Sequence, residues 1–153
     1  MSSAKVAVLA RSMLKPIVQF LDVTIGASGA VTAVANGGPS LTGNTAGDVK
    51  VELISTGRYR VTAGVATKNK LDARNARLID IHAHPVLTAA QAVVTTNPVT
   101  CVTISDVVYD STTGTVDFVC LTAPGALANP PSGAKLRILL VQGGQGQGSF
   151  LPY

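Results

Sequence analysis

Short apolar runs, each closed by residues that favour turns, recur along this chain and limit what it can fold into. The runs with the length and composition of strands are Ile17–Ile25, Ala30–Ala35, Val49–Ser55, Arg58–Ala63, Leu78–His84 and Ala134–Val141. Almost none of them has the three-to-four-residue spacing of a helix. The 20 Val and 16 Thr favour strands, whereas a single Glu and no Trp argue against a helical bundle.

Turn signals separate the runs roughly every 8–12 residues, a spacing typical of about seven to nine antiparallel strands. The sequence therefore predicts an all-β protein, an antiparallel β-sandwich or jelly roll with extended arms at both ends. We expect an N-terminal arm over residues 1–16, a β-sandwich domain over 17–141, and a flexible Gly/Gln arm over 142–153. A chain of 153 residues is long enough to form one such core without disulfides or metals.

Several local features are predicted in more detail. Residues 36–47 have the composition of a loop, and Thr56-Gly57 is expected to turn one hairpin. Pro85 should end the strand that starts at Leu78, and Ala89–Val94 fits either a strand or a helical turn. The uniformly apolar end of the strand Ala134–Val141 indicates a central position in its sheet.

The two cysteines lie near the ends of one predicted hairpin. If Asp110 pairs with Thr115, then Cys120 faces Ser105 and lies roughly 13 Å from Cys101 along the strands, beyond disulfide reach. Both thiols are therefore expected to be reduced and packed, as in a reducing compartment. In the same hairpin Val102, Ile104 and Val107 are expected in the core.

Charge is scarce and unevenly distributed. Charged residues make up 13% of the chain, about half the usual share, which is typical of a protein that buries surface against neighbours. The net charge is +4, with +6 before Leu78 and −2 from there on. This asymmetry indicates either a basic face that meets an acidic partner or a solvated face that keeps the chain soluble.

Neither export nor membrane insertion is indicated. Lys5, Arg11 and Lys15 interrupt the apolar residues that a secretory signal would need. The uncharged stretch from Val86 to Ser105 contains Gln, Asn, Pro and five Thr, which does not suit a spanning helix. We expect a soluble protein that does not contact membranes.

Residues that could carry catalysis or hold a metal are few. His82 and His84 would project from one face of a strand, as a metal pair does, but Leu87 and Thr88 stand where a cupin-like site needs a carboxylate. No nucleophile elbow of the Gly-x-Ser-x-Gly type is present, the two cysteines lie in apolar strands, and Gly143–Gly148 lacks the Lys-Ser/Thr of a phosphate loop. We therefore predict no catalytic residue, no metal, no cofactor and no small-molecule substrate.

Nucleic-acid binding is also not favoured. Arg58-Tyr59-Arg60 is the one place where an aromatic residue alternates with basic ones, and the chain has six aromatic residues in all. The basic cluster Lys68–Arg77 fits an acidic protein surface as well as it fits phosphate. We expect a protein partner.

Four strings of the sequence resemble small virion structural proteins of tailed bacteriophages. They are Thr56–Thr62 (TGRYRVT), Ile79–His82 (IDIH), Asp117–Leu121 (DFVCL) and Asn129–Val141 (NPPSGAKLRILLV). The pattern is similar to that of jelly-roll decoration or cement proteins, which sit as trimers on the capsid and lock neighbouring major capsid proteins together. Related patterns occur in tail-fibre and tail-tip modules.

The resemblance implies a homotrimer that binds the major capsid protein on the exterior of the virion after synthesis in the host cytoplasm. From the residues themselves we expect basic contacts to the shell from Lys5, Arg11, Lys15, Lys68, Lys70, Arg74 and Arg77. Phe150, Leu151 and Tyr153 would clasp an adjacent subunit. The alternatives are a receptor- or glycan-binding module of a tail fibre and a small cupin-like metalloenzyme.

Overall fold

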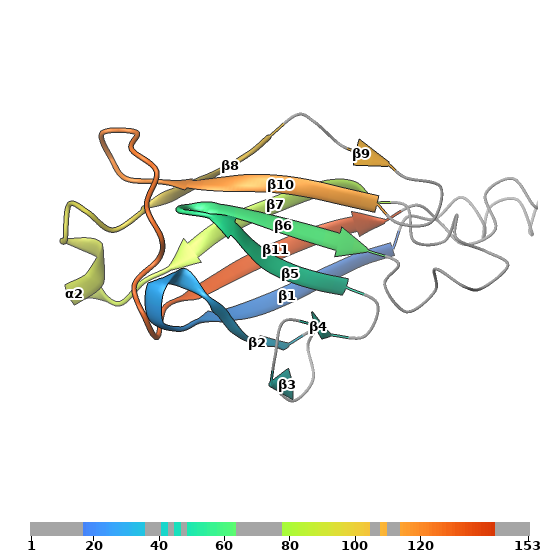
Figure 1. Cartoon of the computed structure of the whole chain (residues 1–153), viewed down its shortest axis with the longest axis horizontal. Helices are drawn as coiled ribbons and strands as arrows, with labels where there is room; N and C mark the ends of the chain where they lie inside the picture. Colours follow the sequence, from blue (N-terminus) through green and yellow to red (C-terminus); the bar gives the residue numbers. More distant parts are fainter. Residues whose placement is uncertain are drawn as a thin grey trace, which may run out of the picture.

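The computed structural model describes residues 17–35, 41–42, 45–46, 49–63, 78–104, 108–109 and 114–142. They form two antiparallel sheets packed face to face (Figure 1). This confirms the all-β sandwich expected from the turn spacing. The jelly-roll assignment stays a prediction, and residues 1–16 and 143–153 of the expected arms lie outside the described residues.

One sheet, called sheet A here, contains both ends of the described chain. In spatial order its strands are β3 (Leu41–Thr42), β2 (Val31–Ala35), β1 (Ile17–Ile25), β11 (Lys135–Gln142) and β7 (Leu78–Val86). Strand β11 lies between β1 and β7, as its apolar end predicted. Gln142, expected in the C-terminal arm, instead pairs with Ile17 and Leu78 as the last residue of this strand.

The second sheet, called sheet B here, contains the other described strands. In spatial order its strands are β4 (Thr45–Ala46), β5 (Val49–Ser55), β6 (Arg58–Ala63), β10 (Gly114–Leu121) and β8 (Thr100–Thr103), and β9 (Val108–Tyr109) also pairs with β10. The hairpin of β5 and β6 has the predicted bounds. Its turn places Gly57 at φ +68°, a conformation that favours glycine.

The core lies between the sheets and follows strand alternation. Its buried side chains are Leu21, Val23, Ile25, Val34, Ile81, Ala83, Leu136, Ile138 and Leu140 from sheet A, and Val49, Val51, Tyr59, Val61, Val116, Phe118 and Cys120 from sheet B. The rings of Tyr59 and Phe118 stack with their centroids 5.6 Å apart. The Tyr59 hydroxyl donates a hydrogen bond to the Gly29 oxygen at 2.8 Å, which joins sheet B to the 3-10 turn η1 (Ala27–Gly29) after β1. Burial raises the pKa of Tyr59, so this hydroxyl keeps its proton.

Two local predictions are corrected, and one open alternative is resolved. Pro85 does not end its strand, because β7 is an edge strand of sheet A and an edge tolerates a residue without a backbone N–H. The 36–47 loop contains the two-residue strands β3 and β4. The undecided segment 89–94 contains the helix α2 (Ala89–Ala92), which begins with a capping box between Thr88 and Gln91. No described helix is both long and apolar enough to span a bilayer.

The predicted register of the cysteine hairpin is wrong. Cys101 pairs directly with Cys120, and Thr115 pairs with Val108 instead of Asp110. The offset between paired residues changes by two between the β9–β10 pairing and the β8–β10 pairing, so one continuous hairpin register does not run through both. The same register turns Val102 outward, so its side chain is about half exposed and not in the core.

Candidate functional site

All ten residues predicted to contact partners lie outside the described residues. They are Lys5, Arg11, Lys15, Lys68, Lys70, Arg74, Arg77, Phe150, Leu151 and Tyr153. Their roles therefore stay predictions, and the candidate site has to be built from the surfaces of the two sheets.

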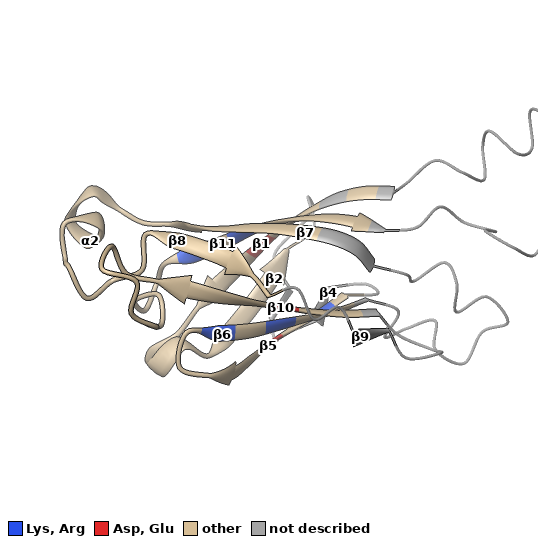
Figure 2. Cartoon of the chain, turned by 90° about the horizontal axis from the view of Figure 1, so that it is seen from above, with Lys and Arg blue, Asp and Glu red and all other residues tan. Residues whose placement is uncertain are grey.

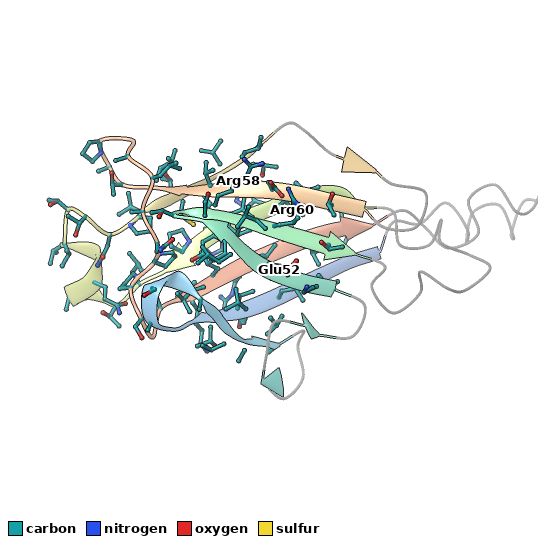
Figure 3. The ribbon with its side chains drawn as sticks, viewed as in Figure 1. Glu52, Arg58 and Arg60 are labelled. Carbon is teal, nitrogen blue, oxygen red and sulfur yellow. The ribbon has the colours of Figure 1, made fainter. Side chains whose placement is uncertain are left out.

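The outer face of sheet B carries a cluster of charged side chains, which Figure 3 shows from above the sheet. Arg60 on β6 lies between Glu52 on β5 and Asp117 on β10 in the strand register. Arg60 Nε donates to Asp117 Oδ1 at 2.7 Å, and Arg58 Nε donates to Asp117 Oδ2 at 2.8 Å. Lys50 pairs with Glu52 at 2.5 Å. Alternation along the strands places all five side chains on the same face.

Asp117 is the centre of this cluster. Its side chain is only 6% exposed although it points away from the core, because the two guanidinium groups cover it. The hydrogen bonds from Arg60 and Arg58 hold the pKa of Asp117 below its ordinary value, against the opposing effect of burial. The same carboxylate raises the pKa of Arg60. Asp117 is therefore an ionised carboxylate whose two oxygens are both occupied by arginine.

This arrangement determines what the cluster can do. A carboxylate held by two guanidinium groups is a poor proton acceptor, so the cluster suits a structural or docking role. Arg58 and Arg60 are each about 40% exposed on their outer side. They can still meet an acidic group of a partner while holding Asp117.

His82 and His84 project from the same face of β7, as predicted. Both are exposed on the outer face of sheet A, with ring centroids 6.3 Å apart. Their neighbours across β11 are Leu139 and Arg137, and Arg137 donates to Asp22 at 2.8 Å. The described residues contain no group of three or more His, Cys, Asp or Glu side chains placed to hold a metal ion.

The end of the sandwich that contains α2 has a different surface. It is formed by four connections, residues 26–30, 54–57, 87–99 and 122–134, in which the sequence has no Lys, Arg, Asp or Glu (Figure 2). Large apolar side chains are exposed on these segments or at the strand ends beside them: Ile54 at the end of β5, Val86 at the end of β7, and Val93, Val94, Val99 and Leu127 on the connections. Val93 is 78% exposed and Leu127 is 52% exposed. We call this surface the uncharged end.

The side chain of Asn129 forms hydrogen bonds to two other connections of the uncharged end. Asn129, in the connection between β10 and β11, accepts from the Gly57 N–H at 2.6 Å and donates to the Ser28 oxygen at 2.9 Å. Gly29 has φ +82°, and a Cβ there would lie 2.5 Å from the Asn129 side chain. Three connections far apart in the sequence are thus fixed against one another.

Sequence reasoning missed Asp117 and Asn129. Asp117 is assigned no site role from the sequence, although its place in the alternating run before Phe118 signals a strand position facing outward. The uncharged end had a visible signal, since residues 85–104 and 118–134 lack charge in the printed sequence. That the two segments meet at one end depends on the pairing of β8 with β10.

Comparison with protein-family models, with curated proteins and with solved structures gave no match.

Proposed function

We propose that this chain is a structural protein of a tailed-phage virion, a decoration protein that binds the outside of the capsid as a homotrimer and stabilises the shell. The observation that carries the proposal is the uncharged end, where six large apolar side chains are exposed on connections without a charged residue or at the strand ends beside them. Depletion of charge together with exposed apolar groups is typical of the centre of a protein interface.

The uncharged end is suited to rigid docking. Asn129 fixes the turns at Ser28 and Gly57, and the capping box fixes the start of α2. A surface that is ordered before binding loses less conformational entropy when the partner arrives. Most of the free energy gained by burying the exposed valines and Leu127 against the partner would then contribute to affinity.

A trimer would strengthen binding through a surface of this kind. A single small apolar surface binds weakly, whereas three copies held in one assembly engage several capsid subunits at once and gain avidity. In this proposal the uncharged end faces the shell.

The first experiment measures the solution mass by light scattering and then the binding of the protein to undecorated capsids of the phage that encodes it. We expect a trimer and bound copies in multiples of three. Replacing Val93 and Leu127 together by Lys should lower the affinity about tenfold or more, because buried charge without a partner is costly.

Val18→Lys is the matched control, since Val18 is 55% exposed on β1 at the opposite end of the sandwich. It should bind capsids as the unchanged protein does, provided that light scattering confirms the trimer. A monomeric protein that ignores capsids would overturn the proposal and favour the tail-fibre module. Equal losses in the control and the double variant would refute the role of the uncharged end.

A further inference from the structure

Cys101 and Cys120 face each other across strands β8 and β10. They are directly paired in the antiparallel register, and their sulfurs lie 3.4 Å apart with a thiol hydrogen bond between them. Both are free cysteines. Cys120 is fully buried in the core, whereas Cys101 is partly exposed beside it.

The backbone hydrogen bonds show which kind of cross-strand pair this is. The Cys120 N–H donates to the Gly57 oxygen, and the Cys120 oxygen accepts from the Ala128 N–H, so neither group bonds to Cys101. Further along the same strands, the Ile104 N–H donates to the Asp117 oxygen. Bonded and non-bonded pairs alternate along an antiparallel ladder, and the Cys101–Cys120 pair lies three positions from the bonded pair Ile104–Asp117. Cys101 and Cys120 are therefore a non-hydrogen-bonded pair.

Such pairs bring the two Cα atoms within about 4.5 Å and point the side chains toward each other. A disulfide requires Cα atoms about 4.4–6.8 Å apart. The backbone of β8 and β10 is thus already placed for a bond, and only the two sulfurs need to approach.

We propose that Cys101 and Cys120 are an oxidisable pair that closes into an intramolecular disulfide and fastens β8 to β10. With a small organic disulfide as oxidant, the Cys101 thiolate attacks one of its sulfurs and releases one small thiol. Cys120 then attacks the Cys101 sulfur of the mixed disulfide and releases the second thiol. The protein loses two protons and two electrons, and the small disulfide gains them.

The difference in exposure sets the order of the two steps. Cys101 can be reached by a solvent-borne oxidant, whereas Cys120 is reached only by Cys101. The hydrogen bond from Cys101 and burial both raise the pKa of the Cys120 thiol, so closure should be slow at neutral pH and faster in alkaline solution. A reducing cytoplasm keeps such a pair open, and an oxidising medium closes it.

The position of β8 determines the consequence. It is an edge strand of sheet B whose described ladder partner is β10, and Thr103 adds a hydrogen bond to the Ile81 oxygen of sheet A at 3.1 Å. A covalent bond at Cys101 would hold this edge in place and close a loop of about twenty residues. The proposal does not depend on the function proposed above.

The test uses the full-length chain treated with oxidised glutathione, quenched in acid and denatured. We expect both thiols to become inaccessible to iodoacetamide, the mass to fall by two hydrogen atoms, and the chain to stay monomeric on a denaturing gel without reductant. The rate of the closing step should be independent of protein concentration. Thermal unfolding of the oxidised protein should shift upward by roughly 6–12 °C, and dithiothreitol should reverse the shift.

Cys101→Ser is the control that cannot close the bond, and it changes the partly exposed member of the pair. Its buried Cys120 should stay alkylatable after the same treatment and its unfolding temperature should not rise. The thiol count and mass of the unchanged protein decide the question even if this variant folds poorly. Two thiols that remain alkylatable, disulfide-linked dimers, or an unchanged unfolding temperature after closure would each overturn the proposal.

Discussion

The side-chain oxygen of Asn129 accepts a hydrogen bond from the Gly57 N–H at 2.6 Å, across 72 residues of sequence. The amide nitrogen of the same side chain donates to the Ser28 oxygen at 2.9 Å. The Gly57 oxygen accepts from the Cys120 N–H on β10, and Asn129 supplies a partner for the N–H of the same residue. The order of the uncharged end depends on this residue.

Asn129→Ala should lower the free energy of unfolding by about 2 kcal/mol, because two hydrogen bonds are lost at about 1 kcal/mol each. Urea unfolding followed by circular dichroism measures this. Asn129→Asp is the matched control: it can still accept from Gly57 but cannot donate to Ser28, so it should fall between the two. An alanine variant as stable as the unchanged protein would contradict the structural role of Asn129.

Gly57→Ala should destabilise the fold more than Gly125→Ala. Both glycines have positive φ, which costs an L-residue about 1–2 kcal/mol. A Cβ at Gly57 would also lie 2.8 Å from the Ala128 nitrogen and 3.1 Å from the Cys120 oxygen, whereas a Cβ at Gly125 meets nothing within 4 Å. Thermal unfolding measures the two variants: Gly125→Ala has only the backbone strain, whereas Gly57→Ala has the strain and the clash with backbone atoms. Equal decreases in unfolding temperature would exclude the clash.

Asp117→Asn should lower stability near neutral pH by about 2–3 kcal/mol, because charge-assisted hydrogen bonds from Arg58 and Arg60 are lost in a covered site. The pKa of Asp117 is lower in the folded chain than its ordinary value of 3.8. Its stabilisation is therefore complete above about pH 4 and is lost as the pH falls through the folded pKa.

Urea unfolding at about pH 6 and about pH 2.5 tests that dependence. The unchanged protein should lose more stability on acidification than Asp117→Asn does. Asp22→Asn is the control, because the pKa of Asp22 is also lowered by a hydrogen bond from Arg137 but that pair is more exposed, so the effect should be smaller. If Asp117→Asn and the unchanged protein lose equal stability on acidification, then the ionised Asp117 carboxylate does not provide the predicted stabilisation.

Tyr59→Phe should lower the free energy of unfolding by about 1–3 kcal/mol. The variant keeps the ring stacked on Phe118 but leaves the Gly29 oxygen without its buried donor. Phe118→Tyr serves as a comparison, since it adds a hydroxyl to a fully buried ring. If Tyr59→Phe unfolds at the same urea concentration as the unchanged protein, the hydrogen bond to Gly29 contributes nothing to stability.

Much of the fold could be predicted because strand alternation is local. The bounds of β1, β5 and β6 agree with the predictions, and within β6 the buried Tyr59 alternates with Arg58 and Arg60 on the outer face. The central place of β11 followed from its apolar end. These properties depend on a side-chain period of two residues, which the chain order itself sets.

Pairing between strands was less predictable. The cysteine register could not be predicted because the pairing offset of β8 on β10 differs by two from that of β9 on β10, and local alternation does not specify such a shift. The error of four positions at Cys120 changed the expected separation of the sulfurs from roughly 13 Å to contact. Pro85 could be placed within its strand only once β7 was known to be an edge.

The sequence by itself determined an all-β sandwich, its longest strands, and two stretches without charge. Only the tertiary structure decided that these stretches share one end, that Asp117 lies between Arg58 and Arg60 from 59 and 57 residues away, and that Asn129 reaches Ser28 across 101 residues. The physical reason is that alternation is encoded in neighbouring residues, whereas register and sheet packing depend on the whole chain satisfying its buried polar groups at once.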